Sequence, residues 1–109
     1  MTKSHPTGQS GLYQALLTLK TPEEMFRFLQ DVCSYSELSA MEQRFAIAEM
    51  LHDKQLYVSI VDKTGASSAI ISRVSRVLAR SDSALGRVLD ETVAGSPSAP
   101  NTKGVAPHV

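Results

Sequence analysis

Residues 57–80 read Y-V-S-I-V-D-K-T-G-A-S-S-A-I-I-S-R-V-S-R-V-L-A-R, and this stretch decides the fold. Apolar residues at helical spacing precede Gly65, and a second apolar series follows Ser67. Because glycine adopts the left-handed backbone conformation without a Cβ clash, Gly65 is suited to end the first helix. Ser67 can cap the next helix, which is expected to begin at Ser67 or Ser68. The stretch therefore predicts two helices joined by a tight turn.

This pair of helices fits a helix-turn-helix, the motif whose second helix enters the major groove of duplex DNA. Numbered from Tyr57, the positions that must pack the two helices together are almost all apolar. They are Ile60, Val61, Thr64, Ala66, Ile71 and Val74. Val61 stands where a small alanine is commonest at the helix crossing, so we expect slightly wider packing of the two helices.

The outward side of the second helix carries small hydroxyl residues and arginines. Small side chains let a helix approach the floor of a groove, and arginine can bind guanine or phosphate. Arg73, Arg76 and Arg80 are spaced i, i+3 and i+7, which predicts that they share one side of the helix. Any solvated helix can carry three arginines, but here they coincide with the turn glycine and the apolar inward positions. The predicted DNA-binding residues are Lys63, Ser67, Ser68, Ala69, Ser72, Arg73, Arg76 and Arg80.

Length and composition indicate one small domain and exclude several classes of protein. The chain has 109 residues, of which 42% are hydrophobic. No apolar run approaches the roughly 18 residues of a membrane span, and no secretory segment opens the chain, so a cytoplasmic location is expected. The single cysteine, Cys33, cannot form an internal disulfide. His5, His52 and His108 are scattered, so we expect no metal site, no cofactor and no enzymatic activity.

The net charge is zero, yet the charges are unevenly distributed along the chain. Residues 12–53 contain seven acidic and three basic side chains, a net charge of −4. Residues 54–80 contain five basic side chains and one acidic side chain, a net charge of +4. An acidic first half would orient the basic face and reduce indiscriminate binding to phosphate.

Further helices flank the central motif on both sides. Thr21-Pro22-Glu23-Glu24 is typical of a helix start, with threonine as the N-cap, proline at the first position and Glu24 completing a capping box. The other helices are expected over residues 12–19, from a start between Ser34 and Ser39 to about His52, and after Ser81-Asp82-Ser83 to an end near 92–95.

The two ends of the chain differ in composition from its middle. Residues 1–11 are polar and contain Pro6, Gly8 and Gly11, which predicts a flexible arm. Residues 95–109 are small, polar and rich in proline, which predicts a disordered tail. The helix-turn-helix DNA-binding domain is therefore expected over residues 12–94.

The predicted helices of residues 12–51 carry more apolar surface than one thin layer can cover. A single core of this size is marginal when it stands alone. We therefore expect a homodimer joined through residues 12–51. Two-fold symmetry would also present two recognition helices to DNA half-sites about one helical turn apart.

Several short motifs, in this order, resemble the Trp repressor superfamily. They are Gln43-Arg44, Thr64-Gly65-Ala66 and Ile71-Ser72-Arg73. Residues 12–89 are most similar to its YerC/YecD-like branch, through L-Y-Q-A-L-L-T-L-K-T-P-E-E-M-F-R-F-L-Q-D-V-C and T-G-A-S-S-A-I-I-S-R-V-S-R-V-L. The resemblance implies an all-α, six-helix domain that contains a helix-turn-helix and forms an intertwined homodimer.

The resemblance also bears on a ligand. The Trp repressor holds tryptophan between two arginines, and the matching residues here are Arg44 and Arg73. The family's glycine and serine that follow are replaced by Val74 and Val77, whose side chains would fill the space for an indole ring and offer no hydroxyl. We therefore expect a vestigial pocket of these four residues and no tryptophan-dependent switch. Arg44 is expected to pair with a carboxylate, and Arg73 to grip DNA phosphate or pair with an acid.

Taken together, these patterns predict a sequence-specific DNA-binding transcriptional regulator, a repressor that does not depend on tryptophan. One alternative is a protein-interaction module that has kept the helix-turn-helix shape. The other is a repressor gated by an effector other than tryptophan.

Overall fold

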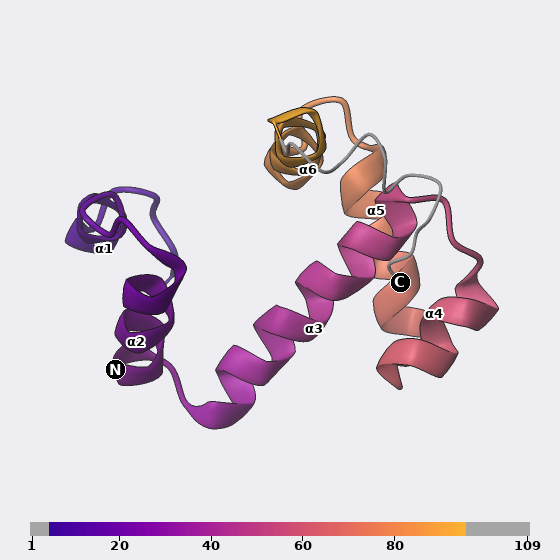
Figure 1. Ribbon diagram of the computed structural model, residues 1–109, viewed down its shortest axis with the longest axis horizontal. Coiled ribbons are helices and arrows are strands. Elements are labelled where there is room, and N and C mark those ends of the chain that lie inside the picture. Colours follow the sequence, from indigo (N-terminus) through magenta and orange to yellow (C-terminus); the bar gives the residue numbers. More distant parts are fainter. Residues whose placement is uncertain (1–4, 96–109) are drawn as a thin grey trace. The chain divides into compact units, whose positions relative to one another are not determined.

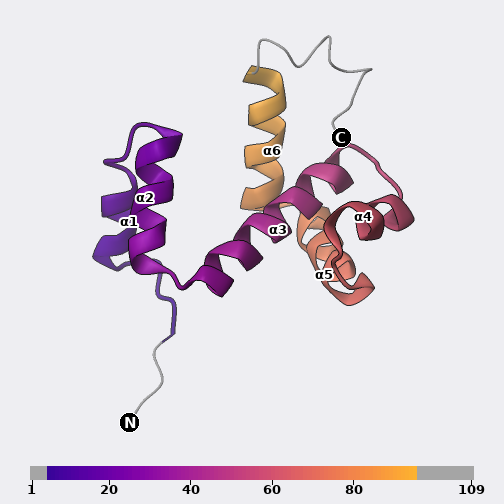
Figure 2. The same ribbon diagram turned by 60° about the horizontal axis from the view of Figure 1, so that its bottom comes forward.

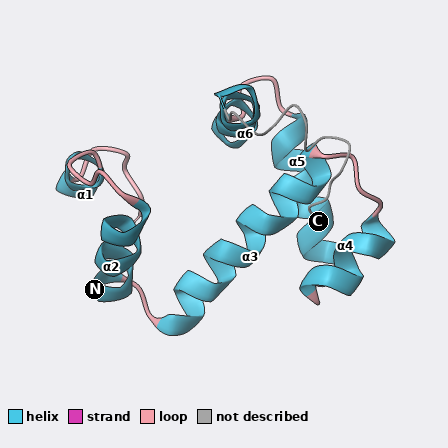
Figure 3. Ribbon diagram, viewed as in Figure 1, coloured by secondary structure: helices cyan, strands magenta, loops and turns pink. Residues whose placement is uncertain are grey.

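The computed structural model describes residues 5–95, which form six α-helices and no strand (Figures 1 and 3). The all-α fold expected from the sequence is therefore confirmed. The helices are α1 (Gly11–Leu16), α2 (Pro22–Val32), α3 (Tyr35–His52), α4 (Tyr57–Thr64), α5 (Ser68–Ala79) and α6 (Ala84–Gly95). The chain divides into two compact units within α3, between Leu38 and Ser39. Apart from Gly95, the predicted tail lies outside the described residues.

The first helix is shorter than the sequence suggested. The hydroxyl of Ser10 caps α1 by accepting a hydrogen bond from the amide of Leu12 at 3.2 Å. The helix ends at Leu16, whereas residues 12–19 were expected. Thr18 forms a closing turn there, with its hydroxyl donating to the carbonyl of Ala15 at 2.7 Å. The same carbonyl also accepts the amide of Thr18 at 3.0 Å, so two donors of one residue bind it at the helix end.

The predicted start of α2 is confirmed in its main feature. Thr21 is the N-cap, and its hydroxyl accepts the amide of Glu24 at 3.1 Å, with Pro22 in the first turn. The carboxylate of Glu24 accepts the amide of Lys20 at 2.7 Å, one residue before the N-cap amide that a capping box would use.

The structure places the start of α3 at the earlier end of the expected range, Ser34 to Ser39. The amide of Glu37 donates to the hydroxyl of Ser34 at 3.1 Å, and the amide of Ser34 donates to the carboxylate of Glu37 at 2.7 Å. This reciprocal capping box selects the earlier start. Hydrogen bonds from the backbone and side chain of Ser34 lower the pKa of Glu37. These hydrogen bonds favour the charged carboxylate. Their contribution to the stability of the folded chain is therefore present above the ordinary pKa of glutamate and is lost as pH falls through the lowered pKa.

The buried core lies in the C-terminal unit, residues 39–95. Figures 1 and 2 show α4 and α5 beside the last turns of α3, with α6 following α5. The core is a small set of aliphatic side chains from all four helices and the turn before α5: Ile47, Ala48, Ile60, Ala66, Ile71, Val74 and Leu89. At the edge of this core the hydroxyl of Ser83 caps α6 by accepting the amide of Gly86 at 3.0 Å. His52, at the end of α3, contacts Asp90 of α6 at 2.6 Å.

The helix-turn-helix has the predicted turn but not all of the predicted packing. Gly65 is left-handed, with a φ of 72°, and its amide donates to the carbonyl of Val61 at 2.8 Å. Ile60 and Ile71 are fully buried, as expected, whereas Val61 is 39% exposed. Helical periodicity places Val61 about 100° around α4 from Ile60, on the side of Tyr57. The expectation that Val61 packs inward is therefore wrong.

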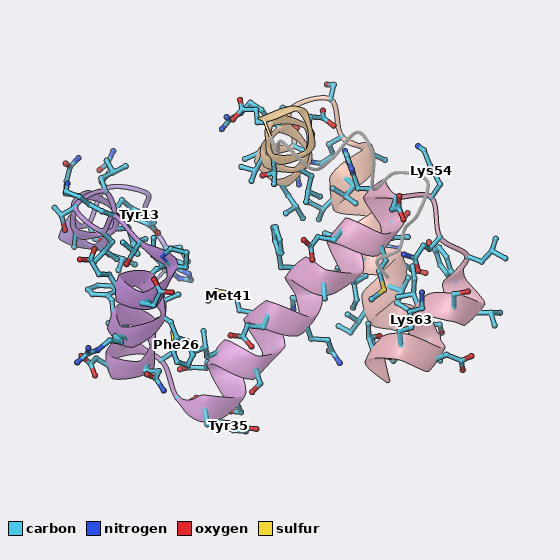
Figure 4. All side chains as sticks on the ribbon, viewed as in Figure 1. Tyr13, Phe26, Tyr35, Met41, Lys54 and Lys63 are labelled. Atoms are coloured by element: carbon cyan, nitrogen blue, oxygen red, sulfur yellow. The ribbon has the colours of Figure 1, made fainter. Side chains whose placement is uncertain are left out.

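The N-terminal unit presents apolar side chains that it does not bury. Helix α2 separates apolar from polar residues strongly, yet none of its residues is buried. Phe26 is 48% exposed and Val32 is 56% exposed. Figure 4 shows Phe26 and Tyr13 among the side chains of this unit. None of the helices in residues 5–95 is long and apolar enough to cross a membrane.

A lysine occupies a position at the end of α3 that usually requires glycine. Lys54 has a φ of 64°, and its amide donates to the carbonyl of Leu51 at 3.0 Å (Figure 4). The amide of Gln55 donates to the carbonyl of Met50 at 3.0 Å, which completes a Schellman motif. Residues other than glycine pay a steric cost in this conformation.

Replacing Lys54 by glycine should raise the free energy of unfolding by about 0.5–1 kcal/mol, because the strain of the left-handed backbone is relieved. Urea denaturation followed by circular dichroism measures the change. Lys54→Ala is the matched control, since it removes the same side chain but keeps the Cβ atom. An equal gain in both variants would show that backbone strain is not the cause.

Candidate nucleic-acid interface

The first turn of α5 is exposed and well ordered by its cap. Ser67 has an extended backbone, and its hydroxyl accepts the amide of Ile70 at 3.2 Å. Ser67, Ser68 and Ala69 are all exposed. Small exposed side chains at the positive end of a helix dipole allow close approach to a negatively charged partner.

One side of α5 is exposed along its length, and the opposite side is buried. Ala69, Arg73 and Arg76 are exposed, and Ser72 beside them is half-buried. On the opposite side, Ile71 is fully buried. Within residues 5–95 the arginine–carboxylate ion pairs are Arg80 with Asp82 and Arg87 with Glu91, and His52 contacts Asp90. Arg73 and Arg76 are therefore not neutralised by carboxylates in the described part of the chain.

Arg80 lies at the end of α5 rather than inside it. Helix α5 ends at Ala79, and Arg80 is its C-cap, with an amide that still donates to the carbonyl of Val77. The chain leaves the helix after Arg80, and the shared side of Arg73, Arg76 and Arg80 stays a prediction. The Nε atom of Arg80 lies 3.2 Å from a carboxylate oxygen of Asp82 in a pair that is exposed to solvent. Exposed pairs of this kind contribute little, so Arg80 can exchange its partner.

Lys63 lies in the last turn of α4, where Figure 4 labels it. Its Nζ atom donates to the side-chain oxygen of Gln55 at 3.0 Å. Sequence reasoning missed this contact, because no local pattern connects two residues that lie on either side of a helix start. The hydrogen bond restricts the lysine while leaving it exposed.

Sequence reasoning also missed the role of Gln43. Its Nε2 atom donates to the carbonyl of Thr64 at 3.1 Å, and the contact is partly buried. In the sequence, Gln43 stands out only as part of the Gln43-Arg44 motif. The hydrogen bond joins residues 21 positions apart, so no helical periodicity could have indicated it.

The four residues of the predicted vestigial pocket come together around one cavity of about 250 Å³. The cavity lies within the C-terminal unit and has mainly apolar walls. Its lining residues are Met41, Arg44, Phe45, Ile70, Arg73, Val74, Val77 and Leu85. Val74 and Val77 were expected to fill this space, but they line it and leave it open. Arg44 lines the cavity and forms no ion pair within residues 5–95, contrary to the expected carboxylate partner.

Within the part of the chain that the structure describes, no group of three or more histidine, cysteine, aspartate or glutamate side chains is placed to hold a metal ion.

The exposed side of α5 carries hydroxyl and guanidinium groups. These groups bind phosphate oxygens and the edges of bases.

Comparisons with known proteins show which family the chain belongs to. A family model described as Trp repressor protein matches residues 9–93. The chain is 40% identical over 79 residues to the uncharacterized protein YerC of Bacillus subtilis, covering 72% of this chain and 76% of YerC. It is also similar to a crystal structure of a TrpR-like protein from Eubacterium eligens, with a TM-score of 0.69 and 42% identity, covering 73% of this chain and 82% of that one. The chain therefore belongs to the Trp repressor family, in its YerC-like branch.

Proposed function

We propose that this protein is a sequence-specific transcriptional repressor that binds duplex DNA by placing α5 in the major groove. The observation that carries the proposal is the exposed side of α5, where Arg73 and Arg76 follow a capped first turn of small residues. The opposite side of the same helix packs into the core through Ile71 and Val74. Membership in a family of helix-turn-helix DNA-binding regulators supports the same function.

The proposed contacts with DNA are of two kinds, those to base edges and those to the phosphate backbone. Ser68 and Ala69 are small enough to let α5 approach base edges, and Arg76 is long enough to reach either guanine or phosphate. Lys63 on α4 would bind the phosphate backbone, where its charge gives affinity without sequence preference. The net charge of +4 over residues 54–80 attracts DNA, and the net charge of −4 over residues 12–53 orients that approach.

A homodimer is part of this proposal. Helix α2 is strongly amphipathic but buries no residue in its own unit, and Phe26 and Val32 remain about half-exposed. Met41 and Phe45 on α3 are also exposed, at 45% and 38%. A second copy of the chain would cover these side chains and present two α5 helices to two half-sites. The intertwined arrangement of the two chains is proposed from the family resemblance.

The cavity supports a second candidate function, a repressor gated by a small molecule other than tryptophan. Its polar lining residues are Arg44 and Arg73, and its other walls are apolar. Guanidinium groups attract a carboxylate, and none of the lining side chains carries a hydroxyl or carboxylate that could accept a hydrogen bond from an ammonium group. The cavity is therefore suited to an apolar molecule that carries an anionic group and no amine.

Replacing Arg76 by alanine should weaken DNA binding by about 1–3 kcal/mol, because a guanidinium contact to a base or phosphate is lost. Fluorescence anisotropy with an oligonucleotide selected by the wild-type protein measures the loss. If Arg76 binds phosphate, the weakening will be uniform across sequences and the salt dependence will decrease. The matched control is Arg87→Ala, which removes the same charge from α6, where Arg87 pairs with Glu91 at 3.3 Å. Equal losses of DNA affinity in the two variants would show that Arg76 of α5 does not contact DNA.

The salt dependence of the wild-type protein separates the proposal from a protein-interaction module. Binding that neutralises phosphates weakens steeply as salt rises, whereas an apolar protein interface does not.

Replacing Phe26 by glutamate should convert a dimer into a monomer, because a charge would be buried without a partner against the second copy. Sedimentation equilibrium should give the wild type twice the chain mass of 11.8 kDa and the variant a single mass. Arg27→Glu changes the charge more strongly on the polar side of α2 and should remain dimeric. A wild type that is monomeric at all concentrations tested would contradict the dimer.

Calorimetric titration should detect no binding of tryptophan at micromolar concentrations, because the arginine-lined cavity offers no acceptor for its ammonium group. Indole-3-propionate is the matched ligand, since it keeps the ring and the carboxylate but lacks the amine. Micromolar binding of tryptophan would overturn the expected tryptophan independence. Binding of indole-3-propionate alone would favour the second candidate function.

A further inference from the structure

The turn of the helix-turn-helix is held by a side chain from outside the motif. Gln43 lies in α3, and its Nε2 atom donates to the backbone carbonyl of Thr64 at 3.1 Å. Thr64 is the last residue of α4, so its carbonyl has no acceptor role within that helix. The contact is partly buried, and it ties the end of α4 to α3 across 21 residues of sequence.

The other polar contacts of this turn are local. The hydroxyl of Thr64 donates to the carbonyl of Ile60 at 2.7 Å and accepts the amide of Ala66 at 3.1 Å. The amide of Gly65 donates to the carbonyl of Val61 at 2.8 Å. Among the hydrogen bonds described for these turn residues, that of Gln43 is the one that comes from another helix. It is therefore the described hydrogen bond that links the turn to α3, beside the apolar packing of Ala66 in the core.

We propose that Gln43 is a positioning residue that fixes the turn, and with it the first turn of α5, for contact with DNA. The consequence for DNA rests on the proposed function, whereas the effect on the turn does not. Gln43 itself touches the backbone of Thr64 and is not assigned a contact with DNA. Its amide acts by keeping the carbonyl of Thr64 satisfied while the turn stays closed around Gly65 and Ala66.

The energetics favour a local effect over global unfolding. A partly buried carbonyl that loses its donor must find water, which requires the turn to open. The apolar contact between α4 and α5 is expected to persist, because Ile60 and Ile71 are fully buried in the core and this packing does not use the amide of Gln43. Removing the amide should therefore loosen the turn while leaving the two helices packed.

Amide hydrogen exchange in the free protein, followed by NMR, tests the first part of the proposal. Gln43→Met keeps the length of the side chain without a donor, and it should speed exchange of the Gly65 and Ala66 amides about fivefold. Gln43→Lys supplies a new N–H donor and should restore slow exchange. Glu42→Met places the same new side chain at a neighbouring exposed position of α3 and should change nothing. Unchanged exchange in Gln43→Met would overturn the proposal.

DNA binding tests the second part. The dissociation constant of Gln43→Met should rise about fivefold, while the slope of its logarithm against the logarithm of salt concentration stays that of the wild type. A merely destabilised protein would instead show faster exchange throughout the core, including Ile47 and Ile71. Faster exchange in the turn with unchanged DNA affinity would also contradict the proposal. Exchange is measured without DNA, so it tests the role of Gln43 in the turn whether or not the protein binds DNA. A wild type that binds no DNA would count against the proposed function alone.

Discussion

The apolar contact between α4 and α5 across the turn at Gly65 is the constraint on which the rest of the structure depends. Ile60 and Ile71 are fully buried against one another's helices and the end of α3. This contact decides which side of α5 is covered and which is left to solvent. The positions of Arg73 and Arg76 on the open side follow from it, since a helix that buries one side must expose the other.

The two units of the chain differ in how many apolar side chains they bury. The C-terminal unit gathers its core from α3 to α6, and the buried residues are few and mostly aliphatic. The N-terminal unit has well-capped helices, with Thr21 and Ser34 at their starts, but no buried residue in α1 or α2. Capping selects where a helix begins but does not give it a place to pack. The homodimer that we propose supplies that place, and it links folding to the display of two recognition helices.

Features set by neighbouring residues could be predicted from the sequence, and features set by distant contacts could not. The cap at Ser67 and the left-handed turn at Gly65 are local, and both were predicted correctly. The exposure of Val61 depends on the angle at which α4 meets α5, which a position in a motif does not specify. The open cavity depends on how α3, α5 and α6 come together, and the hydrogen bond of Gln43 on a long-range contact. Local propensity carries no information about such contacts.

Selection of bound fragments from a random pool of duplex DNA is the most direct test that the exposed side of α5, which carries Arg73 and Arg76, recognises DNA. The account predicts enrichment of a two-fold symmetric site, with half-sites separated by about one helical turn, because two copies of α5 would enter successive major grooves. Recovery of no sequence above background, at low as well as moderate salt, would contradict it.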